Sequence, residues 1–148
     1  MAKKYMTTYD PSKKCARARI DDVNVSYKKL AAVCDNVRGM QIEDAMAFLK
    51  DVIAMKRPVR FRRWNKKMGH RRELGGKKGR YPINAAKVIL QLLKNAKANA
   101  DAMGLLNPFI VHIAANKKHN YPRISPKGRP MMADYETAFA EVILEDRS

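Results

Sequence analysis

A dense run of basic residues between Lys56 and Arg80 is the strongest chemical signal in this sequence. Its 25 residues include twelve lysines or arginines and a single acid, Glu73. Because each buried charge would need a partner, we expect this run to remain a loop outside the core. Alone in water its like charges would repel one another, so it makes physical sense only against a dense anionic surface such as nucleic acid. A solvated linker is the simpler alternative.

Aromatic residues within the run favour the nucleic-acid interpretation. Phe61 and Trp64 lie among closely spaced arginines of the chain. These arginines are Arg57, Arg60, Arg62 and Arg63. Guanidinium groups bind phosphate through forked hydrogen bonds, and flat aromatic faces stack on bases. A linker rarely contains Trp and Phe, so we expect this run to bind RNA.

The side chains that support catalysis do not form a constellation. His70, His112 and His119 are not placed beside a Cys or a carboxylate at metal-ligand spacing, and we interpret His112 as a packed strand residue. The glycine-rich stretch 75–79 lacks the GxxxxGK[ST] order and the preceding strand of a nucleotide-binding loop. Its backbone N–H groups could cradle a phosphate, but we interpret it as a flexible basic loop. We therefore predict that the protein is not an enzyme and uses no cofactor or metal.

The charge of the whole chain agrees with an anionic partner. The net charge is +17 over 148 residues, which bears on partner choice and association rate rather than on fold. No apolar run approaches the ~20 residues of a membrane span, and the polar residues after Met1–Tyr5 give no secretory signal. Cys15 and Cys34 form no CxxC pair, so we expect reduced thiols, no zinc site and a cytoplasmic protein.

Hydrophobic periodicity predicts the elements that position these charges within a single domain, 1–148. Residues 1–14 form a polar N-terminal extension, and residues 15–20 alternate as a strand with Arg17 and Arg19 on its outer face. Ser26 is placed to cap a first helix that ends at Arg38-Gly39, and a second helix follows from Ile42 to before Pro58. A third and longest helix covers 85–103. Its expected apolar stripe is Ala85, Val88, Ile89, Leu92, Leu93, Ala96, Ala100 and Met103.

The last third of the sequence predicts a long β-hairpin over 108–146. Residues 108–116 and 135–144 alternate as strands, with Phe109, Val111, Ile113 and Ala115 on one face of the first. The polar connector near 117–132 is the hairpin tip, and long ordered loops are usually functional. At ~3.3 Å per residue the extended hairpin could reach roughly 40–50 Å. The carboxylates of the closing strand, including Glu141, are interpreted as a solvated face.

Several segments together resemble the family of the twenty-second protein of the large ribosomal subunit. They are Asn84–Lys87, Leu92–Ala100, Val25–Lys29, Val37–Met40 and Pro58–Asn65. The likeness extends from about Cys15 to Asp146. The long basic insert at 56–82, between the second and third helices, resembles the archaeal and eukaryotic branch of the family.

The resemblance implies an α+β fold, with three helices packed on a small three-stranded antiparallel sheet. It also implies a long protruding hairpin and a long basic RNA-binding loop. The implied function is structural: binding large-subunit ribosomal RNA beside neighbouring ribosomal proteins, supporting assembly, and lining the nascent-peptide exit tunnel with the hairpin tip. The nascent polypeptide is then a partner of the tip, whereas DNA and membrane insertion are not expected. Relative to that branch, Tyr121–Pro130 has few arginines and three prolines, and the prolines would hold the shape of the tip.

The candidate site residues fall into two groups. The RNA-binding candidates are Arg17, Arg19, Lys28, Lys29, Arg57, Arg60, Arg62, Arg63, Trp64, Lys66, Lys67, Arg71, Arg72, Lys77, Lys78, Arg80, Lys87 and Lys94. The tunnel-facing tip candidates are Tyr121, Arg123, Lys127 and Arg129. The alternative is a free-standing nucleic-acid-binding regulator, but a helix-turn-helix reader would carry its basic residues on a helix rather than in loops. An RNA-modifying enzyme is a third and weaker possibility, because no catalytic cluster is present.

Overall fold

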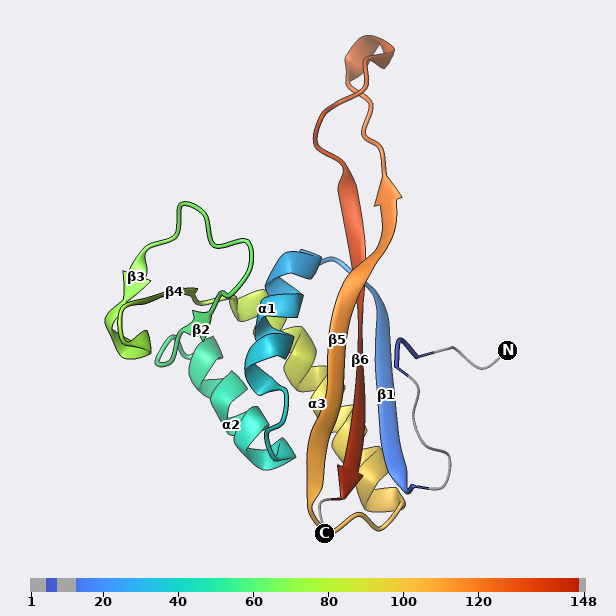
Figure 1. Cartoon of the computed structure of the whole chain (residues 1–148). Helices are drawn as coiled ribbons and strands as arrows, with labels where there is room; N and C mark the ends of the chain where they lie inside the picture. The colour runs from blue at the N-terminus through green and yellow to red at the C-terminus, as the bar shows by residue number, and fades with distance from the viewer. Residues whose placement is uncertain (1–4, 8–12, 147–148) are drawn as a thin grey trace.

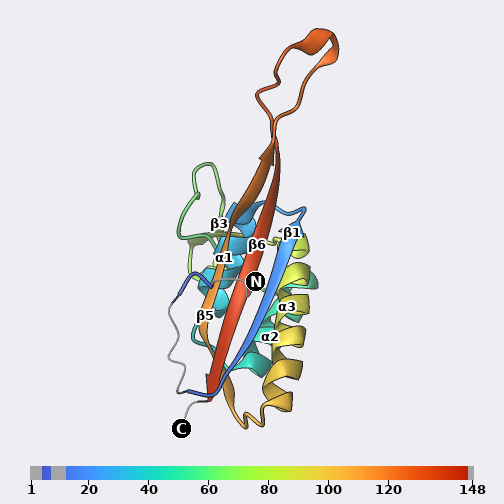
Figure 2. The ribbon, with the colours of Figure 1, turned by 90° about the vertical axis from the view of Figure 1, so that its right-hand side faces the viewer.

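The computed structural model describes residues 5–7 and 13–146 (Figure 1). Strands β1 (Cys15–Val23), β5 (Pro108–Tyr121) and β6 (Tyr135–Asp146) form an antiparallel sheet in the order β1-β6-β5. Helices α1 (Tyr27–Val37), α2 (Ile42–Ile53) and α3 (Ile83–Ala102) cover one face of this sheet (Figure 2). The predicted α+β fold class is confirmed. Most of the extension predicted for residues 1–14 lies outside the described residues.

The first strand and helix follow the sequence pattern closely. Strand β1 continues three residues beyond the predicted end, and Ala16 and Ala18 on its inner face are buried. Helix α1 begins after Ser26 as predicted, and the Ser26 carbonyl accepts hydrogen bonds from the amides of Lys29 and Leu30 at 3.0 and 3.1 Å. The Ser26 side chain makes no capping bond, so the cap consists of backbone alone.

A glycine turn fixes the two short helices against the sheet. Gly39 has a φ of +78°, a conformation that residues with a Cβ adopt only with strain. Its amide donates to the carbonyl of Ile110 at 2.9 Å, and the Ile110 amide donates to the carbonyl of Met40 at 3.0 Å. The turn between α1 and α2 therefore occupies the free edge of β5, which would otherwise expose unpaired backbone groups.

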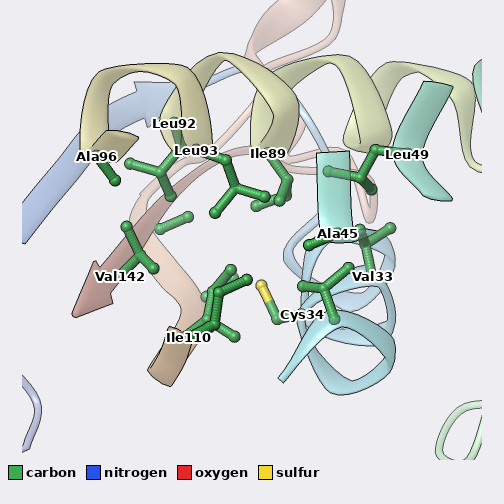
Figure 3. Packing of buried hydrophobic residues seen from close by; sticks show 14 of the residues in the cluster. Val33, Cys34, Ala45, Leu49, Ile89, Leu92, Leu93, Ala96, Ile110 and Val142 are labelled. Carbon is green, nitrogen blue, oxygen red and sulfur yellow. The ribbon is translucent and has the colours of Figure 1, made fainter. Parts of the chain in front are cut away.

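The core lies between the three helices and the inner face of the sheet (Figure 3). Leu92 and Leu93 of α3 are both buried, together with Ile110 of β5 and Val142 of β6. One predicted core position is wrong: Met103 lies after the last turn of α3 and is exposed. The alanines of α3 that lie in the core, which let the helix approach its neighbours closely, are Ala85, Ala86, Ala96 and Ala100.

The hairpin strands are longer than predicted, and one of them contains bulges. Pairing continues to Tyr121 opposite Tyr135, so residues 117–121 belong to β5 and the tip proper is 122–134. The register shifts between Ile110 and His112, and a bulge reverses the faces that alternation assigns to a strand. For this reason Ile110 and Ile113 are both buried while Val111 is exposed, so the prediction that Val111 shares a face with Ile113 was wrong.

The basic segment is more ordered than the sequence suggested. It contains a second antiparallel sheet of β2 (Val59–Arg60), β4 (Lys77–Arg80) and β3 (His70–Arg71), in the order β2-β4-β3. A 3-10 helix, η1 (Arg72–Leu74), precedes β4. The prediction of a loop outside the core was wrong for part of this segment. Two apolar residues near its start enter the core, while most of its charges stay at the surface.

No helix within the described ranges is both long and apolar enough to cross a membrane.

Candidate nucleic-acid interface

Residues 59–80, which we call the basic sheet, project beside α1 and α2, away from the hairpin (Figure 1). Most of the predicted RNA-binding side chains in and beside it are exposed. These are Arg57, Arg62, Arg63, Trp64, Lys66, Lys67, Arg72, Lys77 and Arg80. Arg60, Arg71 and Lys78 are half-buried. The structure thus gathers these cations on one projecting unit.

Asn36 of α1 attaches the basic sheet to the core. Its Nδ2 donates to the carbonyls of Ala32 at 2.7 Å and Arg60 at 2.8 Å, and the Arg60 amide approaches its Oδ1 at 3.3 Å. Val59 and Phe61, on either side of Arg60, are buried in the main core. Phe61 is 4% exposed, so the prediction that it stacks on bases was wrong. It anchors the cations instead.

Close packing within the basic sheet requires a glycine. A Cβ built on Gly79 would lie 2.8 Å from the carbonyl oxygen of Val59, which is shorter than ordinary van der Waals contact. The Gly79 carbonyl accepts a 3.2 Å hydrogen bond from Nε of Arg71. The Arg71 guanidinium also lies over the ring of Tyr81, 5.4 Å from its centroid. Arg71 therefore stabilises the sheet from within.

The glycine-rich stretch is an ordered turn rather than the flexible loop we expected. The amide of Gly75 donates to the carbonyl of Arg72 at 2.9 Å, and that of Gly76 donates to Arg71 at 3.0 Å. This turn closes η1 and leads directly into β4. Its hydrogen bonds hold the ends of β3 and β4 in register, with Arg71 opposite Lys77.

Trp64 is the aromatic residue of the basic sheet that remains at the surface. It is 41% exposed, and its ring meets that of Tyr27 edge-on, with centroids 5.7 Å apart and planes at 80°. The Arg63 guanidinium lies 5.3 Å from the Trp64 ring. Tyr27 was absent from the predicted site because its helical spacing indicated a core residue, although its position before Lys28-Lys29 was a usable signal.

The helices carry a smaller share of the positive charge. Lys28 and Lys29 are exposed in the first turn of α1, and Lys87 and Lys94 are exposed seven residues apart on α3. This spacing places the two α3 lysines on the same side of the helix. These four residues add exposed positive charge to the helical layer.

Arg17 and Arg19 lie elsewhere, on the sheet face opposite the helices. The Arg19 guanidinium is 2.9 Å from Oδ1 of Asp21 and 3.5 Å from Oε2 of Glu141, and it stacks over Phe139 at 4.4 Å. The Arg17 guanidinium lies over the ring of Tyr5 at 5.7 Å. The structure does not bring these two arginines to the basic sheet, so we leave them out of the proposed surface.

Glu141 does not lie on the solvated face that alternation predicted. Its side chain is fully buried, because residues 5–7 cover this part of the sheet. The Met6 amide donates to its Oε1 at 2.6 Å, and Nε2 of His112 lies 3.3 Å from the same oxygen. His112 is therefore a packed strand residue, as predicted, and its partner is this carboxylate.

The hairpin tip forms a separate exposed unit, distant from the basic sheet (Figure 1). The predicted tip residues Tyr121, Arg123, Lys127 and Arg129 are all exposed. The tip is closed by backbone hydrogen bonds from Ser125 to Arg129 at 2.8 Å and from Met131 to Arg123 at 2.9 Å. At its base the ring of Tyr121 lies 5.9 Å from that of Tyr135.

The chemistry expected of a metal centre or a reactive thiol is not found in the part of the chain that the structure describes. Within residues 5–7 and 13–146, no three or more His, Cys, Asp or Glu side chains are grouped to hold a metal ion. Cys15 and Cys34 are buried free thiols. Burial raises the pKa of the Cys34 thiol to about 12, which keeps it in the unreactive protonated form at neutral pH.

The structure is that of a small basic α+β protein with a projecting cationic sheet and a long hairpin. Residues 18–145 match the family described as ribosomal protein L22p/L17e. The chain belongs to this family.

Similar curated proteins are found in archaea. Each of the three described here is named large ribosomal subunit protein uL22. The protein from Methanocaldococcus jannaschii is 44% identical, covering 97% of this chain and 94% of its own length. That from Methanosphaera stadtmanae is 40% identical, covering 97% and 98%. The protein from Ignicoccus hospitalis is 39% identical, covering 90% and 89%.

These matches confirm the predicted family. The protein is accordingly a structural, non-enzymatic ribosomal protein. The alternatives of a free-standing nucleic-acid-binding regulator and of an RNA-modifying enzyme are set aside.

Proposed function

We propose that the protein is a cytoplasmic structural constituent of the large ribosomal subunit that binds ribosomal RNA, mainly through the basic sheet. It supports assembly together with neighbouring ribosomal proteins. Its hairpin tip lines the exit tunnel and meets the nascent polypeptide. Family membership and the names of the archaeal relatives support the location, and the two exposed units described above support the division of roles.

The main observation in support of RNA binding is that the segment holding the cations is attached to the core. Free lysines and arginines on a mobile loop would lose conformational entropy on binding. Here Asn36, Val59 and Phe61 hold the start of the basic sheet on the helical layer before any RNA arrives. The exposed cations are therefore partly pre-positioned, which lowers the cost of association.

Salt dependence of RNA affinity tests this assignment. Each phosphate contact contributes about 0.7 to 0.9 to the slope of log K against log salt. We expect the double variant Arg62→Ala, Lys66→Ala to bind a large-subunit RNA fragment more weakly and with a shallower slope. The matched control is Lys13→Ala, Lys14→Ala, which removes the same charge from exposed residues that precede β1. If the slopes of log K against log salt were equal for the two double variants, the basic sheet would not be part of the RNA interface.

The tip is expected to be separable from anchoring. Residues 122–134 contribute no side chain to the hydrophobic core, so replacing them with a two-residue Asn-Gly turn between Tyr121 and Tyr135 should leave the domain folded. We expect the shortened chain to enter large subunits efficiently. Failure of the folded, shortened chain to enter subunits would show that the tip itself is an anchor.

Crosslinking then tests the tunnel position. Ile124 is exposed at the tip, and the native thiols of Cys15 and Cys34 are buried, so a cysteine introduced as Ile124→Cys offers one reactive thiol. In translating ribosomes it should crosslink to nascent chains, whereas a cysteine introduced as Lys50→Cys on the exposed side of α2 should not. Translating subunits in which the tip thiol never reaches a nascent chain would falsify the tunnel placement.

A further inference from the structure

Trp64 is held in an unusual position at the edge of the basic sheet. It is the one tryptophan of the chain and is 41% exposed. Its φ is +51°, a left-handed conformation that is strained for a bulky residue. A turn of this shape forms more readily with Gly or Asn. Neither the core nor the turn therefore accounts for a tryptophan here.

The Trp64 ring is positioned by groups from two elements. The ring of Tyr27, at the start of α1, meets it at 5.7 Å and 80°, and the Arg63 guanidinium lies 5.3 Å from its centroid. Arg63 is itself held by an ion pair of 3.3 Å with Asp35 of α1. The indole is thus fixed from outside its own turn, while a large part of its surface stays open to solvent.

The surroundings of this ring are cationic rather than apolar. The exposed basic residues adjacent to Trp64 and Tyr27 in sequence are Arg62, Lys66, Lys67, Lys28 and Lys29. Asp35, the acid that faces this cluster, is paired with Arg63 and also with Arg38 at 3.4 Å. These charges leave no continuous apolar surface around the Trp64 ring for an apolar protein partner to contact. A partner with a flat face and several negative charges fits both features.

We propose that Trp64, supported by Arg63 and Tyr27, is a stacking site for one unpaired base of RNA. The neighbouring cations bind phosphates of the same strand. This inference rests on the proposed RNA-binding function and adds to it a defined contact, because phosphate binding alone needs no aromatic ring. Unstacked bases of loops and bulges present the face that such a ring accepts.

Fluorescence of the single tryptophan tests the site in the full-length wild-type protein. The probe is a fluorescein-labelled single-stranded octaadenylate, and its control is an abasic strand of the same length and charge. Anisotropy of the label reports binding, and Trp64 emission of the unlabelled complexes reports stacking. We expect the octaadenylate to quench Trp64 emission at least twofold more than the abasic strand does when both are bound at saturation.

Variants separate stacking from electrostatics. Trp64→Leu should weaken octaadenylate binding about tenfold and leave the affinity for the abasic strand unchanged, while Trp64→Phe should retain most of the affinity. Leu106→Ala, which removes an exposed apolar side chain just before β5, is the matched control and should bind as the wild type does. Because Trp64 lies outside the core, circular dichroism should show all three variants folded.

The outcomes distinguish this inference from the function on which it rests. If octaadenylate quenches Trp64 emission no more than the abasic strand does, and binds Trp64→Leu as tightly as the wild type, the stacking site is overturned. Electrostatic RNA binding then remains intact. Such a result would make Trp64 available for a protein neighbour. If neither strand binds at low salt, RNA binding by the free protein and the stacking site are both overturned.

Discussion

The backbone amide of Met6 donates a 2.6 Å hydrogen bond to Oε1 of Glu141, on the sheet face opposite the helices. Glu141 is fully buried, and Arg19 and His112 lie on its two carboxylate oxygens. A buried carboxylate is tolerated only when such partners satisfy it. Residues 5–7 are therefore held against the sheet by the side chain of Glu141 in β6, the central strand.

Loss of the Glu141 carboxylate should release residues 5–7 and destabilise the fold. Glu141→Ala removes the acceptor of Met6 and one acidic contact of Arg19, so we expect a loss of ~1–3 kcal/mol in the free energy of unfolding. Glu141→Gln keeps one carbonyl acceptor and should cost less. Urea denaturation measures the stability, and hydrogen exchange at the Met6 amide measures the docking. Unchanged protection of Met6 in Glu141→Ala would contradict this role.

Truncation within α3 tests the position of the core. Leu93 is completely buried between α3 and the other layers (Figure 3), and Leu93→Ala should lower the free energy of unfolding by ~2–5 kcal/mol. Leu106→Ala is the matched control because Leu106 is 88% exposed, and it should change stability by less than ~0.5 kcal/mol. Similar values for the two variants would mean that the layers pack differently.

The basic sheet should lose its attachment when Asn36 is removed. Asn36→Ala deletes the two donors to Ala32 and Arg60, and we expect a loss of ~1–3 kcal/mol. In hydrogen exchange of the free protein, the amide of Phe61, which donates to Lys78 at 3.1 Å, should become faster in the variant. The amides of α3 should lose far less protection. An equal loss of protection at Phe61 and in α3 would indicate that the whole domain is destabilised, rather than only the attachment of the basic sheet.

The helices could be predicted from sequence because their signals are local. The stripe from Ala85 to Ala100 repeats with the helical period, and Gly39 and Gly104 mark the ends of α1 and α3. The bulge near Val111 was not visible, because an extra residue in a strand leaves the composition unchanged while it reverses the faces. Local patterns thus gave the element types but not every buried face.

Contacts between distant segments account for the other differences. The carbonyl of Arg60 is bonded to Asn36 of another element, and Phe61 entered the core although its neighbours are basic. Glu141 looked solvated because alternation cannot show that residues 5–7 cover it. The cationic character of the site followed directly from residue types, whereas the role of Tyr27 beside Trp64 required the three-dimensional fold.

Cys34 gives a final test of the core through its ionisation. Burial raises the pKa of its thiol from the ordinary 9.0 to about 12, so the folded state keeps the proton while the unfolded state loses it as the pH rises above 9. The stabilising effect of the protonated thiol is complete below pH 9 and is lost between pH 9 and 12, with a slope of at most about 1.4 kcal/mol per pH unit. In a Cys15→Ser background, Cys34 should resist iodoacetamide in native buffer and react fully in urea. The pH dependence of unfolding between 9 and 10.5 should be shallower in Cys34→Ala. Alkylation of the native thiol at the rate of the unfolded one would show that this part of the core is open to solvent.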